Sequence, residues 1–409
     1  MTTSARRILL VSPYVPAPWF GFGTRVYELV RQLATRHVVT VLCPAAPEEE
    51  ADVERLRSLG VKVHAVARPE PVRSARRLDQ VVSLLSPLPF HVREHRTAAM
   101  QEAITSLIAA EQFDIVQLEG SQLCGFCFPG TACIVLDEHN IEYEVLQRMA
   151  TGERTRVRRL FSAVEHRKFR RLERLWWTRV AGIAVTSDRE LPVVRHHAPH
   201  TAAAVVPNAV DSEHFTPGNQ EPNPGSILFM GTLKYRPNID AVTFLLDEVL
   251  PDVRRSCPDA VLTIVGDGEA ADLERFRRPG VVVTGRVPDV RPYLAGAAVT
   301  VVPVRIGGGT RLKVVEALAM GKAVVSTSLG CEGLAVRSGE NVLLADDAGG
   351  FAGAIVRLLA EPQEARRMGL AGRKLVVEHY SWARACAALE ELYDSIDRRS
   401  QPTKGMTGT

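Results

Sequence analysis

The chain has 409 residues, of which 46% are hydrophobic and 24% are charged, and its formal net charge is +3. This is ordinary globular composition, and the length predicts two or three domains. The longest apolar runs, such as residues 297–304, are too short to span a bilayer, and the apolar stretch 8–11 is too short for the core of a signal peptide. We therefore expect a cytoplasmic protein.

The seven cysteines are scattered, and only Cys124 and Cys127 form a Cys-x-x-Cys pair. One such pair, with no second pair and no nearby histidine, is a weak signal for zinc. The favoured interpretation is that the cysteines are small core or loop residues, and we predict neither a disulfide framework nor a metal site.

The first half of the chain alternates short apolar runs with helical patterns. Its runs are rich in Val, Ile and Leu, as expected for strands that are buried on both faces. Helical patterns cover residues 24–36 and 98–111. Strands that alternate with helices predict βαβ units and a parallel sheet. The predicted strands are 8–11, 38–43, 61–66, 115–118, 133–136 and 183–185.

A stretch with three prolines and two glycines, residues 216–225, interrupts this alternation and is the predicted interdomain linker. A second alternation follows, so we expect two consecutive doubly wound α/β domains with a cleft between them. In such sheets ligands bind at the carboxyl ends of the strands. The predicted strands are 227–230, 261–265, 281–284, 299–302, 324–326 and 342–344, and the helices are 240–255, 311–320 and 351–359, with two more within 365–398.

Charge is concentrated in one segment. Residues 154–179 contain ten Arg or Lys residues and two Glu residues, so the segment carries +8 and the rest of the chain −5. With Trp176 and Trp177 near its end, this segment could dock on anionic lipid. The favoured interpretation is a charged, solvated face of a long helix. No nucleic-acid-binding module is recognisable, and no nucleic acid is expected as a partner.

Two motifs in the first half follow predicted strands. Gly21-Phe22-Gly23-Thr24 opens a helix, where glycine lets the backbone approach a ligand closely, but Val26 occupies the third position of a Gly-x-Gly-x-x-Gly fingerprint. Residues 137–140 follow the run 134–136 directly. There His139 could bind a sugar hydroxyl or a phosphate, and Asp137 or Glu138 could hold an acceptor or act as an acid or base. The alternatives are a structural glycine turn and a solvated cap.

Two motifs near the linker are weaker when taken alone. Asn208, within residues 206–211, could place its amide in the cleft, although the segment by itself predicts a turn. Residues 231–236 follow a strand and combine Gly231 with Lys234 and Arg236, which is a plausible diphosphate site or equally a solvated turn.

The most informative motif is the glycine loop 305–318. A strand runs into three glycines, 307–309, and these run into a helix. Successive backbone N–H groups in such a loop can cradle a phosphate, assisted by the helix dipole and by Arg311 or Lys313. Glu316, inside the helix, could accept hydrogen bonds from both hydroxyls of a ribose. No Gly-Lys-Ser/Thr follows, so this is not a P-loop.

Taken together and in order, these motifs resemble the large family of nucleotide-sugar-dependent glycosyltransferases with the GT-B fold, known as group 1 or family 4. The resemblance covers nearly the whole chain. It is carried by residues 21–23, 207–211, 229–231 with Pro237-Asn238, 265–268, 285–287 and 307–317 with 321–327.

For the fold, the resemblance implies an α/β protein with two doubly wound, Rossmann-like domains that face each other across a cleft. Residues 1–215 would form the acceptor-binding domain and residues 216–380 the nucleotide-sugar-binding domain. The final helix, 381–398, would pack back on the first domain, and residues 399–409 would form a disordered tail.

The resemblance also implies roles for single residues. Glu316 matches the family's ribose-binding glutamate, His139 matches the histidine that contacts the donor sugar, and the backbone near Val287 would meet the base. The expected catalytic residues are His139, Arg311 and Lys313. The expected donor-binding residues are Gly21, Gly23, Asn208, Gly231, Lys234, Gly266, Arg286, Val287, Gly308, Gly309, Thr310 and Glu316, and the expected acceptor-binding residues are Asp137, Glu138 and Asn140.

Such enzymes transfer a sugar with retention of anomeric configuration, and the leaving diphosphate acts as the base. They usually need no metal, so we expect no cofactor beyond the nucleotide sugar, with UDP as the more frequent nucleotide. The acceptor would be a saccharide, a lipid or a small metabolite. Two alternatives remain at this stage, namely a relative with other chemistry, such as a sugar-nucleotide epimerase, and a non-catalytic binding protein.

The sequence departs from the family pattern in its charged positions. The first of the two glutamates that the family often pairs is replaced by Gly308. The usual arginine after Gly231 is Thr232, and the usual lysine a turn later is near Asn238. We expect Arg311 and Lys313, with Lys234, to supply the positive charge instead.

Overall fold

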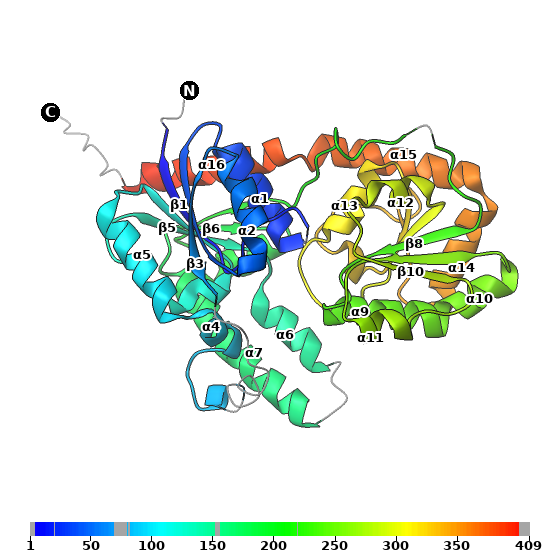
Figure 1. Ribbon diagram of the computed structural model, residues 1–409, viewed down its shortest axis with the longest axis horizontal. Coiled ribbons are helices and arrows are strands. Elements are labelled where there is room, and N and C mark those ends of the chain that lie inside the picture. Colours follow the sequence, from blue (N-terminus) through cyan, green and yellow to red (C-terminus); the bar gives the residue numbers. More distant parts are fainter. Residues whose placement is uncertain are drawn as a thin grey trace. The chain divides into compact units, whose positions relative to one another are not determined.

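The computed structural model describes residues 5–19, 21–68, 80, 82–151, 156–218 and 220–400. They form two compact units. One contains the described residues up to Pro207 together with those from Ala385 onward, and the other is Asn208–Arg384. Figure 1 shows the course of the chain.

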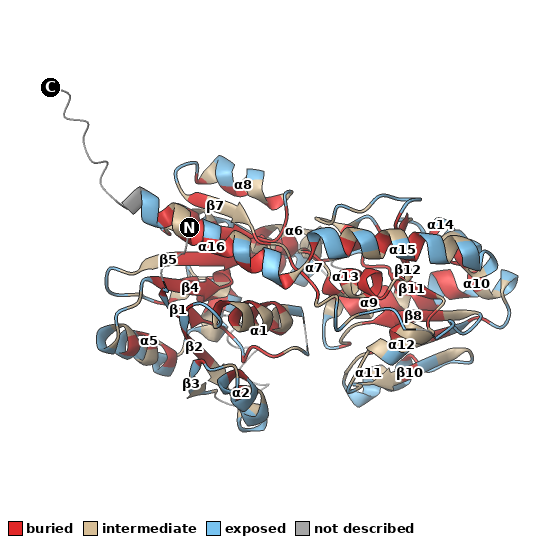
Figure 2. Cartoon of the chain, turned by 90° about the horizontal axis from the view of Figure 1, so that it is seen from above, coloured by how far each residue is buried: buried red, intermediate tan, exposed pale blue. Residues whose placement is uncertain are grey.

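The first unit is built on a parallel sheet in the order β3-β2-β1-β4-β5-β6-β7. Its inner strands β1, β4 and β6 are almost wholly buried (Figure 2), as expected for strands covered on both faces, whereas the edge strand β3 has no buried residue. The seventh strand was not predicted, because three of its four residues are alanine. The strands are β1 (Arg7–Val11), β2 (Val38–Ala45), β3 (Lys62–Ala67), β4 (Ile115–Glu119), β5 (Cys133–Glu138), β6 (Gly182–Val185) and β7 (Ala202–Val205).

Helices cover this sheet, and two of them, α6 and α7, lie side by side and extend away from it (Figure 1). The last helix is tied to the sheet by charge, since the Arg6 guanidinium, with only 8% of its side chain exposed, pairs with Asp394 and Asp397. The helices are α1 (Gly21–Leu33), α2 (Glu50–Arg57), α4 (Phe90–His95), α5 (Ala98–Ala110), α6 (Glu142–Thr151), α7 (Arg156–Trp177), α8 (Glu190–His197) and α16 (Trp382–Ser400).

The second unit has a six-stranded parallel sheet in the order β10-β9-β8-β11-β12-β13. The strands are β8 (Ser226–Met230), β9 (Val261–Val265), β10 (Val281–Gly285), β11 (Val299–Val302), β12 (Ala323–Ser326) and β13 (Leu343–Leu344). The helices are α9 (Arg236–Phe244), α10 (Leu250–Ser256), α11 (Ala270–Arg275), α12 (Arg291–Gly296), α13 (Leu312–Ala319), α14 (Ala348–Ala360) and α15 (Pro362–His379).

Strand order fixes where each sheet can bind a ligand. In the first unit the order reverses between β1 and β4, and in the second unit it reverses between β8 and β11. The loops after such neighbouring strands leave in opposite directions and open a crevice at their carboxyl ends. The segments that follow β1, β4, β8 and β11 are therefore the places to look for a site, and they include the glycine loop 307–309.

Three predicted boundaries differ from the structure. The units divide at Pro207, not at residue 216, because Val206 still bonds to Val185 beside β7, whereas Val210 already bonds to Tyr380. The predicted helix 240–255 is interrupted by a π-helical turn, Leu245–Val249, just before Pro251, which has no N–H to donate. The tail was predicted to begin at residue 399, but α16 continues to Ser400, and residues 401–409 lie outside the described residues.

Within the described part of the chain, no helix combines the length and the apolar character that crossing a membrane requires.

Glycine at position 266 lets the ends of β8 and β9 approach each other. A Cβ atom there would lie 2.1 Å from the carbonyl oxygen of Gly231. We expect Gly266→Ala to lower the free energy of unfolding by about 3 kcal/mol, because the backbone must shift. The matched control is Gly353→Ala in α14, where a Cβ meets nothing within 4 Å, and this change should stabilise by about 0.5–1 kcal/mol. Urea denaturation measures both, and equal effects would contradict the prediction.

Candidate functional site

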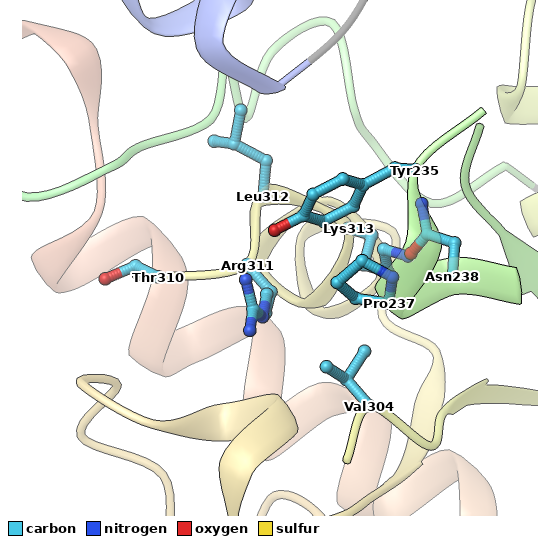
Figure 3. Close-up of a pocket in the computed structure, with 8 residues that line it drawn as sticks. All are labelled: Tyr235, Pro237, Asn238, Val304, Thr310, Arg311, Leu312 and Lys313. Atoms are coloured by element: carbon cyan, nitrogen blue, oxygen red, sulfur yellow. The ribbon is translucent and has the colours of Figure 1, made fainter. Parts of the chain in front are cut away.

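A pocket of about 150 Å³ lies at the carboxyl ends of β8 and β11 in the second unit (Figure 3). One wall comes from the start of α9 and the other from the end of the glycine loop and the start of α13. It therefore occupies the crevice that the strand order predicts. Its lining residues are Tyr235, Pro237, Asn238, Val304, Thr310, Arg311, Leu312 and Lys313.

The glycine loop needs its glycines for conformation and for space. Gly307 and Gly309 have φ values of 114° and 71°, in the left-handed region that side chains disfavour. A Cβ atom on Gly307 would also lie 3.0 Å from an Arg311 nitrogen. The preceding Arg305 anchors the loop by pairing with Asp240 at 3.1 Å. The loop is thus held at its start by Arg305, and its end leads into the pocket lining at Thr310.

The ammonium group of Lys313 is the central charge of the pocket. It donates a hydrogen bond of 2.9 Å to the Asn238 Oδ1 atom and lies 4.7 Å from the centre of the Phe229 ring. Burial, followed by the positive charge of Arg311, lowers the pKa of Lys313 from 10.5 to about 7, although Glu316 opposes the shift. A bound anion would place a negative charge beside Lys313, which raises the pKa of the amine and favours its protonated form.

The loop after β8 is shaped around this lysine. Asn238, which is 7% exposed, also donates to the carbonyl of Thr232 at 2.9 Å. A Cβ atom on Gly231 would lie 2.6 Å from the Lys313 Nζ atom, so a larger residue at position 231 would displace the ammonium group. Asn238 stands where the sequence analysis expected a lysine, and the ammonium group beside it is that of Lys313 from α13.

Glu316 lies one turn further along α13. Its carboxylate is half-buried and forms no hydrogen bond or ion pair with any residue that the structure describes. Burial raises the pKa of Glu316 from 4.5 to about 7, and the positive charge of Lys313 limits the rise. A carboxylate in this state is suited to accept hydrogen bonds from a ligand's hydroxyl groups.

Arg311 is the second cation of the pocket. Its Nη1 atom donates to the carbonyl of Gly308, so it holds the end of the glycine loop. Thr310, which is 8% exposed, accepts a hydrogen bond of 3.0 Å from the Asn208 amide through its carbonyl oxygen. The predicted residues Asn208, Gly231, Gly266 and the 308–313 segment are thus gathered around one crevice.

Among the predicted donor-binding residues, Thr310 lines the pocket, whereas Lys234, Arg286 and Val287 do not. Lys234 has 63% of its side chain exposed and pairs with Asp267 at 2.7 Å. Arg286 and Val287 directly follow β10, at the edge of the sheet. The structure brings Arg311 and Lys313 together as predicted, but it does not place Lys234 with them.

In the first unit, His139 follows β5 and is held on two sides. Its Nε2 atom lies 2.9 Å from the Glu119 Oε2 atom. Its ring stacks on Phe22 of α1, with the centres 4.3 Å apart and the planes 17° apart. Gly21 and Gly23 lie in the first turn of α1, so the helix begins at residue 21 and not at the predicted residue 24. His139 is thus fixed at the carboxyl end of the sheet.

The neighbouring carboxylates correct the sequence-based prediction of acceptor contacts. Asp137 is fully buried in a two-bond ion pair with Arg25, at 2.8 and 3.0 Å. Glu138 is 1% exposed and accepts a hydrogen bond of 2.7 Å from the Trp177 indole. Both side chains hold elements of the fold together and offer no surface to an acceptor. Asn140 remains partly exposed and bonds Glu142 at 3.4 Å.

Three side chains of this cluster could each offer one atom to a metal ion, since Glu119, Asp137 and His139 have such atoms within 4.8 Å of one another. Asp137 is already engaged by Arg25, and Glu119 by His139. A cation would have to compete with a buried guanidinium, which disfavours a metal site. The prediction that no metal is used stays a prediction.

Two family models match the chain. Residues 20–214 match the model for Glycosyltransferase Family 4, and residues 224–361 match the model for Glycosyl transferases group 1. The chain belongs to the group 1, or family 4, glycosyltransferases.

Curated relatives are similar to parts of this family member. It is 32% identical over 166 residues to a GDP-mannose-dependent alpha-(1-6)-phosphatidylinositol monomannoside mannosyltransferase of Mycolicibacterium smegmatis, covering 36% of this chain and 43% of that protein. It is 26% identical over 214 residues to a glycogen synthase of Mycobacterium tuberculosis, covering 48% and 50%. The matches therefore span about half or less of these relatives' length.

Solved structures are similar over nearly the whole chain. Sucrose-phosphate synthase of Thermosynechococcus elongatus is 19% identical, with a TM-score of 0.70, over 97% of this chain and all of that one. Anabaena HepE, solved with UDP and glucose, is 13% identical, with a TM-score of 0.68, over 95% of this chain and 100% of that one. At such identities the likeness establishes the fold alone, and the predicted GT-B fold class is confirmed.

The sequence did not reveal three buried residues, Arg25, Gln117 and Glu119, whose contacts hold Asp137 and His139 in place. Arg25 lies in the apolar stripe of α1 and is 1% exposed, and Gln117 and Glu119 lie inside the apolar strand β4 with no exposure. A polar side chain within an apolar run is the signal that could have revealed them, because a buried polar group needs a partner. Their partners come from distant segments and could not be named from the sequence.

The shifted pKa values of Lys313 and Glu316 should make the free energy of unfolding depend on pH in two adjacent ranges, with opposite signs. Because the pKa of Lys313 falls from 10.5 to about 7, the unfolded chain binds more protons between these values, and the free energy of unfolding rises with pH there. Because the pKa of Glu316 rises from 4.5 to about 7, the folded chain binds more protons in that window, and the free energy of unfolding falls as pH increases.

We therefore expect Lys313→Met to flatten the increase in stability above about pH 7, and Glu316→Gln to flatten the decrease below it. Urea denaturation at about pH 5, 7 and 9 measures the slopes, with exposed Lys374→Met as the control. Slopes equal to those of the wild type would show that neither group is perturbed by burial.

Proposed function

We propose that this protein is a glycosyltransferase that binds a nucleotide sugar through its second unit and transfers the sugar to an acceptor with retention of anomeric configuration. The observation that carries the proposal is the pocket beside the glycine loop. The pocket combines two cations, Arg311 and Lys313, with a helix N-terminus. One turn further along the same helix lies the carboxylate of Glu316, which forms no hydrogen bond with any residue that the structure describes. The cations and the helix N-terminus suit a diphosphate, and the carboxylate suits the hydroxyl groups of a ribose.

The proposed donor is a UDP-sugar. HepE was solved with UDP and glucose, and the mycobacterial relative is named as GDP-mannose-dependent, so both nucleotides occur among similar proteins. The acceptor class we propose is a saccharide, a lipid or a small metabolite. Neither a metal nor a cofactor is part of the proposal.

The proposed chemistry assigns each residue a limited task. The bond between the anomeric carbon and the diphosphate oxygen breaks, a bond to the acceptor oxygen forms, and the acceptor's proton passes to the leaving diphosphate. Arg311 and Lys313 would stabilise the negative charge that develops on the diphosphate. Lys313 would take up a proton when the anion binds, because its pKa in the empty pocket is about 7. His139 would bind a hydroxyl of the sugar.

The test is a thermal-shift panel of UDP, GDP, dTDP and ADP, followed by their common sugars. A ligand present at about a hundred times its Kd stabilises the folded protein by roughly 2.7 kcal/mol. We expect UDP to raise the Tm, and Glu316→Ala to weaken its binding at least about tenfold through the loss of charged hydrogen bonds.

The matched control is Glu378→Ala, which removes an exposed glutamate from α15 and should leave the shift unchanged. If no nucleotide raises the Tm, the proposed function fails. If UDP binds equally well to Glu316→Ala, the ribose assignment fails while the donor class stands.

We also propose that the outer face of α7 contacts an anionic lipid surface. The two acidic residues of this helix face inward, since Glu165 bonds the Phe90 amide and Glu173 bonds the amides that start α6. The exposed charged residues of the described helix are all arginines, and Val157 and Leu160 are 80% and 66% exposed among them. Cations that flank exposed apolar side chains suit an interfacial helix. The exposed arginines are Arg156, Arg158, Arg159, Arg167, Arg170 and Arg171.

A vesicle co-sedimentation assay tests this contact. Changing Arg167, Arg170 and Arg171 to Gln should weaken binding to vesicles with anionic lipid by about a hundredfold, since each cation near such a surface contributes about 1 kcal/mol. The control changes three exposed arginines of the second unit to Gln, namely Arg255, Arg277 and Arg366. Binding that survives the first set, or that is equal on neutral vesicles, would contradict the proposal.

A further inference from the structure

A chain of hydrogen bonds runs from the last helix to His139 inside the first unit. The Tyr393 hydroxyl of α16 bonds the Gln117 Oε1 atom. The Gln117 amide then donates to the Glu119 Oε1 atom at 2.6 Å, and the Glu119 Oε2 atom meets His139 Nε2 at 2.9 Å. Tyr393, Gln117 and Glu119 have no exposed surface. The chain is therefore shielded from water over its whole length except at His139.

The carboxylate of Glu119 fixes the direction of every bond in this chain. Burial and the charge of Asp137 raise the pKa of Glu119, and the hydrogen bonds of His139 and Gln117 oppose this rise. When the carboxylate is ionised it can only accept hydrogen bonds, so both Gln117 and His139 then donate to it. Once the Gln117 amide nitrogen donates to Glu119, its carbonyl oxygen is left to accept from Tyr393. The Nε2 atom of His139 then carries the proton, and the neutral ring has its lone pair on Nδ1.

Neighbouring contacts hold both ends of the chain in place. Arg6 pairs with Asp394 and Asp397, which follow Tyr393 in α16, and Glu390, which precedes it, contacts His37 at 2.9 Å. At the other end, the ring of His139 is stacked on Phe22. The Asp137 carboxylate lies 3.9 Å from His139 Nε2, so it also favours a proton on that atom.

The other ring nitrogen of His139 is available to a ligand. Nδ1 forms no hydrogen bond with any residue in the described ranges, and 11% of the side chain is exposed. It lies after the carboxyl end of β5, in the part of a parallel α/β sheet where ligands bind.

We propose that Tyr393, Gln117 and Glu119 are positioning residues that hold His139 in the Nε2–H tautomer, so that Nδ1 accepts a hydrogen bond from a hydroxyl of the substrate sugar. The inference rests on the proposed function for the identity of that ligand. A preset acceptor needs no reorganisation when the sugar binds. It also selects for a sugar that has a hydroxyl at that position, because a deoxy sugar leaves the acceptor unpaired.

The tautomer can be observed without activity. Long-range proton–nitrogen correlation spectra of the full-length chain, labelled with ¹⁵N-histidine, distinguish the two ring nitrogens. The chain has 11 histidines, and the His139→Gln variant identifies the signal of interest. At about pH 8.5 an unperturbed imidazole is neutral. We expect His139 to carry its proton on Nε2 alone.

Two variants and one control test the series of hydrogen bonds that links Tyr393 to His139. Glu119→Gln can present an amide N–H to His139, and Tyr393→Phe removes the hydroxyl that orients Gln117. Both should shift His139 to a mixture of tautomers. Tyr143→Phe removes the hydroxyl of another buried tyrosine of this unit, one that takes no part in the hydrogen bonds between Tyr393 and His139. It should leave the spectrum of His139 unchanged. A proton on Nδ1 in the wild type, or a spectrum unaffected by Glu119→Gln, would overturn the proposal.

A second arm measures the consequence for the substrate. Glu119→Gln and Tyr393→Phe should lower the transfer or hydrolysis rate about tenfold and leave UDP affinity unchanged, whereas a 2-, 3-, 4- or 6-deoxy donor sugar should lose this dependence at one position. If no nucleotide sugar binds, the proposed function fails and the spectra still decide the tautomer. If rates stay normal while the tautomer shifts, His139 does not bind the sugar.

Discussion

The half-buried ammonium group of Lys313 is the constraint around which the second unit is arranged. It can be accommodated only because the Asn238 Oδ1 atom accepts a hydrogen bond from it, the Phe229 ring faces it, and Gly231 has no side chain to occupy its place. Gly266 in turn has to be glycine for the loop of Gly231 to approach β9. One charge thus specifies residues on β8, in the loops after β8 and β9, and on α9, and its low pKa keeps the cost of burial small until an anion binds.

The two sheets share a strand order but differ in the chemistry at their carboxyl ends. In the second unit the pocket is lined by two cations, Arg311 and Lys313, and by the start of α13, which suits a diphosphate. In the first unit the corresponding region contains the carboxyl groups of Glu119 and Asp137. Asp137 forms an ion pair with Arg25, and Glu119 is hydrogen-bonded to His139. The same topology therefore supports an anion-binding site in one unit and a set of oriented hydrogen-bond acceptors in the other.

The fold could be predicted from the sequence because it depends on local patterns. Apolar runs at regular spacing gave all but one strand, and the exception, Ala202–Val205, has too little apolar bulk to form a recognisable run. The loop 307–309 was identified because glycines at a strand end have few other uses. The roles of Asp137 and Glu138 could not be read correctly, since their position after a strand is the same for an exposed and a buried side chain. Only Arg25 and Trp177, distant in the chain, decide the outcome.

Gly308 stands where the family often has a glutamate, and this difference affects which groups can contact the sugar. A glutamate there would add a carboxylate beside the loop, whereas Gly308 contributes only a carbonyl, which Arg311 already occupies. Adding negative charge next to Arg311 and Lys313 would also raise the pKa of the lysine and hold it protonated in the empty pocket. With glycine, the pocket keeps a lysine that titrates near neutrality and offers no side-chain acceptor at that position. Under the proposed function, the acceptors for the sugar's hydroxyls near this loop would then come from the backbone and from side chains other than residue 308.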